Sequence, residues 1–149
     1  MIVEEQDAQQ DADVKKHIYL QRVNQLYANI RNWLQDEPLI LENSEIEVIE
    51  ALGKYKAPQL TIKTQEGEQL AEFKPAGASV LLAEGTIDVE GWLDRGYVVY
   101  MLASNPQTFY NNIELDGWYW QEQRLNTEPH FLNKTWLLQL VTWVSDHEF

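Results

Sequence analysis

The segment Val14–Asp36, VKKHIYLQRVNQLYANIRNWLQD, has the most regular apolar pattern in the chain. Its apolar side chains recur at alternating intervals of four and three residues, at Tyr19, Val23, Leu26, Ile30 and Trp33. This spacing places them on one side of a helix, and Tyr27 and Leu34 widen the stripe. Pro38 cannot continue a helix. The segment therefore predicts one long amphipathic helix that ends before Pro38.

The same spacing also fits the seam of a coiled coil. However, the pattern lasts only about three heptads, and the stripe is wider than the a and d positions of a seam require. We therefore expect the helix to pack on a sheet of its own domain.

Residues 1–13 differ in composition from the helix that follows. They carry five acidic side chains among Gln and Ala, and they offer little apolar surface that could offset the entropy of ordering. We predict a mobile acidic tail over residues 1–13 and a single domain over residues 14–149.

The middle of the chain changes to an alternating pattern. Residues 46–52 alternate loosely between apolar and acidic side chains, and residues 60–63 and 70–73 flank a polar loop at 65–68. These patterns predict successive antiparallel strands. Ser44-Glu-Ile-Glu47 also fits a capping box, so a short helix over residues 45–52, ending at Gly53, is an alternative.

The later apolar stretches are short and separated by glycines. Residues 80–83 and 87–89 predict two further strands. Tyr97–Ala103 has apolar side chains at both odd and even positions, which predicts a strand covered on both faces. The Asp116-Gly117 pair predicts a hairpin with a type I′ turn. Asn133 is a suitable N-cap for a final helix that ends near Asp146.

These patterns together predict the fold class. We expect an α+β domain with an N-terminal amphipathic helix, five to six mostly antiparallel strands, and a C-terminal helix packed on the sheet.

The composition limits the classes of partner. The chain has 149 residues with 24 acidic and 11 basic side chains, a formal net charge of −13. This charge argues against phosphate backbones and anionic lipids, and the longest apolar run is shorter than the roughly 18 residues of a membrane span. We expect no nucleic-acid partner and no membrane association. The first ten residues have no basic stretch before an apolar one, so we expect a cytoplasmic protein.

The sequence contains no recognisable catalytic motif. The patterns GxSxG, GxxxxGK[ST] and GxGxxG are absent, and there is no cysteine. The three histidines, His17, His130 and His147, lack the spacing of metal ligands. We therefore expect no cofactor, no metal site and no catalytic residue of a known class.

One carboxylate could still support acid–base chemistry. Asp88 lies between Ile87 and Val89, where desolvation could raise its pKa enough for a general acid. Simple alternation on a strand explains the same pattern, with Asp88 pointing outward, and we favour that interpretation.

The aromatic residues are numerous, with six Trp and seven Tyr. We expect Trp118 and Trp120 to pack in the core against Trp136 and Trp143. Trp92 and Tyr119 are then the better candidates for exposed contact residues, because exposed Trp and Tyr are preferred interface anchors.

We interpret the chain as a non-catalytic module that binds a protein partner, and its net charge favours a basic one. Small acidic bacterial proteins that neutralise toxins, such as immunity proteins and antitoxins, share this character, although only by analogy. The candidate interaction residues are Trp92, Tyr119, Asp116, Glu45, Glu47 and Glu50. Two alternatives remain: a homodimer that covers the second face of the sheet, and a small-molecule binder or carboxylate-based hydrolase.

Overall fold

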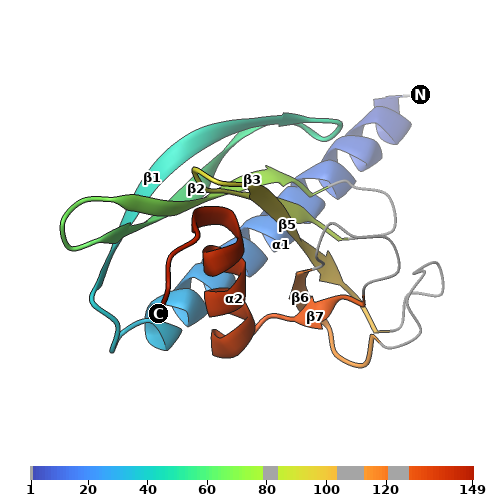
Figure 1. The fold of residues 1–149 in the computed structure, drawn as a ribbon. Helices are drawn as coiled ribbons and strands as arrows, with labels where there is room; N and C mark the ends of the chain where they lie inside the picture. Colours follow the sequence, from blue (N-terminus) through green and yellow to red (C-terminus); the bar gives the residue numbers. More distant parts are fainter. Residues whose placement is uncertain (1, 79–83, 104–112, 121–127) are drawn as a thin grey trace.

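A computed structural model describes residues 2–78, 84–103, 113–120 and 128–149 (Figure 1). These residues form two helices and seven strands, in the order α1 (Ile2–Trp33), β1 (Leu39–Glu50), β2 (Gly53–Thr64), β3 (Gln69–Gly77), β4 (Thr86–Glu90), β5 (Arg95–Met101), β6 (Gly117–Trp120), β7 (His130–Phe131) and α2 (Lys134–Ser145).

The strands form one antiparallel sheet in which each strand pairs with the next along the chain. This confirms the predicted α+β class, with a helix at each end of the sequence. The described residues contain more strands than the five to six expected. The additional strand is β7, whose two residues are too few to produce an alternating pattern. The strand predicted at residues 80–83 lies outside the described residues.

Both helices cover the same face of the sheet. One buried cluster joins apolar side chains of α1 and α2 to those of β2 through β6. At its centre Trp120 contacts Trp136 and Trp143 of α2, each with ring centroids 6.2 Å apart. In Figure 1, β1 and β2 arch over the two helices. The predicted packing of the C-terminal helix on the sheet is therefore confirmed.

The predicted stripe of α1 faces this core. Its buried members are Tyr19, Val23, Leu26, Tyr27, Ile30 and Leu34, and Trp33 is half-buried. Two hydroxyl groups fix the helix to strand backbones: Tyr19 donates to the carbonyl of Thr86, and Tyr27 lies 2.9 Å from the carbonyl of Pro58 and 3.1 Å from that of Phe73. Burial raises the pKa of both tyrosines, so both remain protonated donors.

The helix α1 begins at Ile2 and includes nearly all of the segment for which we predicted a mobile tail. The side chains of residues 9–11 and 13 are exposed, so they add little to the core. Figure 1 shows this end of α1 extending beyond the sheet. The mobility of residues 1–13 in solution stays a prediction.

The strands β1 and β2 form a long hairpin, paired from Leu39↔Thr64 to Glu50↔Gly53. The alternative of a helix over residues 45–52 is therefore wrong, because β2 provides a backbone partner along the whole of β1. Gly53 has a φ of +111°, which L-residues rarely adopt, and this explains why glycine follows the turn.

The predicted hairpin turn at Asp116-Gly117 is wrong. The strand β6 begins at Gly117, which pairs with Met101 of β5, and Gly117 is not among the described glycines with positive φ. Glycine is needed here for a steric reason. A Cβ at this position would lie 2.6 Å from the ring of Phe131 on β7.

The ends of α2 are both capped. Asn133 is the N-cap, as predicted, and its side chain accepts a hydrogen bond of 2.9 Å from a backbone N–H of the first turn. At the other end, the backbone N–H groups of Leu93 and Asp94 donate to the carbonyl of Val144, at 3.0 and 3.1 Å. A Cβ on Gly91 would lie 2.1 Å from that carbonyl oxygen, so this close approach requires glycine.

The face of the sheet opposite the helices is partly covered by the chain itself. Met101 and Tyr119 are buried there with Ile113 in a second, smaller cluster. Tyr97, on the same face, is 41% exposed. The prediction that both faces of Tyr97–Ala103 are covered is therefore confirmed near Met101 and wrong at Tyr97, whose side chain is exposed.

The variant Tyr27→Phe removes a buried hydroxyl donor between α1 and the sheet. We expect the free energy of unfolding to fall by about 1–2 kcal/mol, as when one partner of a buried hydrogen bond is lost. Tyr97→Phe removes an exposed hydroxyl and should change it by less than about 0.5 kcal/mol. Urea denaturation measures both, and equal effects would show that the hydroxyl of Tyr27 contributes nothing specific.

Candidate functional site

The residues predicted to act do not converge on one site. They occupy three regions: the edge of the sheet (Glu45, Glu47 and Glu50), β4 and the turn after it (Asp88 and Trp92), and β6 with the residue before it (Asp116 and Tyr119).

The strand β1 forms an open edge of the sheet. It is 12 residues long and pairs with β2 on one side, while no described strand pairs with its other side. The opposite edge is the two-residue strand β7. An unpaired edge presents backbone N–H and C=O groups to solvent, and these groups can pair with a strand of another chain.

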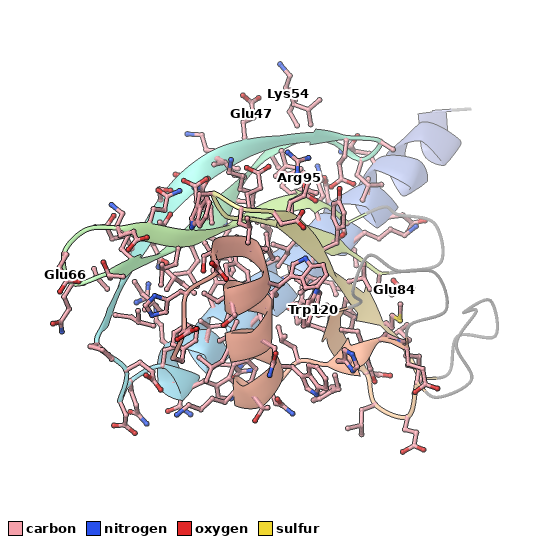
Figure 2. The ribbon with its side chains drawn as sticks, viewed as in Figure 1. Glu47, Lys54, Glu66, Glu84, Arg95 and Trp120 are labelled. Carbon is pink, nitrogen blue, oxygen red and sulfur yellow. The ribbon has the colours of Figure 1, made fainter. Side chains whose placement is uncertain are left out.

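The β1 edge is strongly acidic. Its sequence, LILENSEIEVIE, contains four glutamates and no basic residue. Glu42 pairs with Lys63 on β2 at 3.0 Å, and Glu47 lies 3.9 Å from Lys54. Glu45 is exposed and forms no ion pair with the described residues. In Figure 2, Glu47 and Lys54 point away from the arch into solvent.

Glu50 has a different environment from the other glutamates of β1. Its carboxylate accepts hydrogen bonds from the hydroxyl of Tyr55 and from the backbone N–H of Ala78, the latter at 2.8 Å. Burial, together with the bond to Glu50, raises the pKa of Tyr55 and keeps the phenol protonated. Glu50 thus joins the end of the β1–β2 hairpin to the end of β3.

Trp92 lies in the turn between β4 and β5, and its side chain is 65% exposed. The neighbouring Leu93 is 53% exposed, so the two form an apolar tip. The two hydrogen bonds to Val144 fix this turn on the end of α2. A role for Trp92 in partner binding stays a prediction.

The expectation that Tyr119 is exposed is wrong. Its ring is 4% exposed and packs edge-on against Phe131, with centroids 5.4 Å apart. Its hydroxyl donates to the carbonyl of Leu115 at 2.7 Å. Tyr119 was assigned to the surface because it alternates with two core tryptophans, but residues before β6 cover this part of the outer face. Tyr119 therefore stabilises the fold and offers little contact surface.

Asp88 lies on the face of the sheet away from the helices, while Ile87 and Val89 are fully buried. The fold therefore supports the interpretation that Asp88 points outward because side chains alternate along the strand. Burial raises the pKa of Asp88, the charge of Glu90 adds to this effect, and Lys74 and Arg95 oppose it. Asp88 does not line the cleft between α1 and the β5–β7 end of the sheet.

Sequence reasoning missed a cleft between α1 and the β5–β7 end of the sheet. Its volume is about 210 Å³. The Arg22 guanidinium lies 4.0 Å from the centre of the Tyr100 ring, and the indole N–H of Trp118 donates to the carbonyl of Arg22 at 3.2 Å. Arg22, Gln25 and Asn29 do share helical spacing in the sequence, but no local pattern shows which strands they face.

The described residues show neither a metal cluster nor a membrane-spanning helix. No three His, Asp or Glu side chains among them are placed to hold a metal ion. None of the described helices is both long enough and apolar enough to cross a bilayer.

No protein-family model, curated protein or solved structure matches this chain significantly. Its two strongest features are the acidic β1 edge and the cleft beside α1.

The variant Asp88→Asn tests the environment of this carboxyl group. A raised pKa means that the folded state disfavours ionised Asp88, so the native protein loses stability as pH rises through the folded pKa. We expect Asp88→Asn to raise the melting temperature at pH 7. The gain should vanish below the ordinary value of 3.8, where both states are protonated.

Calorimetry measures the melting temperatures of the variant and of the unchanged protein from below pH 3.8 up to pH 7. Glu66→Gln removes the same charge from the exposed turn between β2 and β3 and serves as the control. A lower melting temperature for Asp88→Asn at pH 7 would mean that attraction to Lys74 and Arg95 outweighs burial.

Proposed function

We propose that this protein is a binding module that captures a basic, extended segment of a partner protein by adding it as a strand beside β1. The observation that carries the proposal is the open 12-residue edge with four glutamates and no basic residue. In strand addition, main-chain hydrogen bonds supply affinity and alternate side chains supply specificity.

The charge of the edge favours lysine and arginine in the partner. Opposite charges in cross-strand pairs contribute roughly 0.2–1 kcal/mol each. Glu45 and Glu47 are the exposed candidates for such pairs, and the long Glu47–Lys54 contact is of the surface type that contributes little. A partner lysine could therefore replace Lys54 at small cost.

The charge of the rest of the chain also favours a positively charged partner. Residues 41–90 contain 10 acidic and 4 basic side chains, and the whole chain has a net charge of −13. Such a field accelerates association with a basic segment, and the acceleration weakens as salt increases.

A second copy of this chain is a poorer occupant of the same edge. Antiparallel pairing of two β1 strands would bring glutamates of both copies together, and like charges across a strand pair are destabilising. The glutamates therefore disfavour self-pairing at neutral pH and at the same time select a basic strand.

A synthetic peptide of alternating lysine and valine tests the mode of binding. We expect saturable binding to the full chain, weakened by salt, with slower hydrogen exchange at the amides of β1. A peptide with the same side chains but N-methylated on every residue keeps its charge and loses the backbone donors of both its edges. It should bind at least about tenfold more weakly, because strand addition depends on those donors.

A matched pair of variants tests the location. Glu45→Gln with Glu47→Gln removes two charges from β1, and Glu66→Gln with Glu68→Gln removes two from the exposed β2–β3 turn (Glu66 is labelled in Figure 2). We expect the β1 pair to weaken binding several-fold and the turn pair to change it little. Equal losses, or tight binding of the N-methylated peptide, would contradict strand addition at β1.

A further inference from the structure

We propose that the cleft between α1 and the β5–β7 end of the sheet is a second binding site, for a free α-amino acid with an apolar side chain. The cleft holds about 210 Å³, and none of its lining residues belongs to β1. The inference is therefore independent of the function proposed for the β1 edge.

Arg22 provides the positive end of the site. Its guanidinium carbon lies over the ring of Tyr100, 4.0 Å from the ring centroid, and Arg22 forms no ion pair with the described residues. A cation–π contact uses none of the five N–H donors of a guanidinium as a conventional hydrogen-bond donor, so they can bind a carboxylate in a bidentate manner.

Asp116 provides the negative end. It lies just before β6 and lines the same cleft. One of its oxygens, Oδ1, accepts a hydrogen bond of 2.8 Å from the backbone N–H of Ala103. An ionised carboxylate has further acceptor positions on both oxygens, so Asp116 can also accept from an ammonium group.

The two charges together select a zwitterion. Arg22 and Asp116 do not pair with each other, so a ligand can lie between them. A simple anion would be attracted by Arg22 and repelled by Asp116, and a simple cation would meet the reverse. An amino acid satisfies both, with its carboxylate at Arg22 and its ammonium at Asp116.

The remaining walls suit an apolar side chain. Leu26, Trp118 and Leu132 are buried, Trp33 is half-buried, and Phe131 forms an exposed part of the lining. Apolar walls with a few converging polar groups are the usual composition of a small-molecule site.

Titration of the full chain with L-phenylalanine and L-leucine tests the site. We expect saturable binding by calorimetry and a shift of the Trp118 indole N–H resonance, because its acceptor is the carbonyl of Arg22. L-phenylalaninamide lacks the carboxylate, N-acetyl-L-phenylalanine lacks the ammonium group, and glycine lacks the side chain. Each should bind about tenfold more weakly or worse, since each loses one of the three contacts.

Variants separate recognition from folding. Arg22→Gln should weaken L-phenylalanine about tenfold and leave the weak binding of L-phenylalaninamide unchanged, because only the former presents a carboxylate. Asp116→Asn should weaken L-phenylalanine and spare the N-acetyl compound. Arg31→Gln and Glu114→Gln, both at exposed positions outside the cleft, should alter neither.

Several outcomes would overturn the proposal. They are absence of saturable binding by either amino acid, equal affinity for L-phenylalanine and its amide, and an Arg22→Gln variant that weakens both ligands equally. The last result would mean that Arg22 only supports the shape of the cleft.

Discussion

The hydroxyl groups of Tyr19 and Tyr27 hold α1 against the backbone of the sheet, and the remaining features depend on that position. The Tyr19 ring packs so closely on Gly85 that a Cβ on that glycine would lie 2.6 Å from a ring carbon. The same ring contacts Trp118, with ring centroids 6.4 Å apart. A buried donor must keep its partner, so the helix can neither slide nor rotate freely. This registration places Arg22 over Tyr100, which forms the cleft. No described strand pairs with the free edge of β1.

An open edge strand is normally a hazard, because it invites association with any other strand. In this protein the edge is long, but its three exposed glutamates, Glu42, Glu45 and Glu47, make pairing with an identical copy unfavourable. The same charges leave a basic strand as the favoured addition. Glu50 does not share this role, since its bonds to Tyr55 and Ala78 make it part of the fold. In the function that we propose, the exposed glutamates select the partner, while the contacts of Glu50 hold the end of the edge in place.

The cleft beside α1 uses charge in a different way. The edge presents one sign over a wide surface, whereas the cleft presents one cation and one carboxylate to the same small volume. Cation–π stacking keeps Arg22 on Tyr100 in a chain where acidic residues are more than twice as numerous as basic ones. A site of this kind distinguishes ligands by the placement of charge rather than by net charge. The two proposed sites therefore call for different classes of molecule.

The sequence by itself determined both helices, the cap at Asn133, the α+β class and most strands, because helical and alternating periodicities are local properties of the chain. It also located the acidic segment that becomes β1. Only the tertiary structure decided that β1 is an open edge, that Tyr119 is buried, and that Gly117 is needed for the ring of Phe131. The cleft belongs to the same group, since Arg22 and Tyr100 are far apart along the chain. These features arise from contacts between distant segments, and local patterns carry no information on which segments will meet.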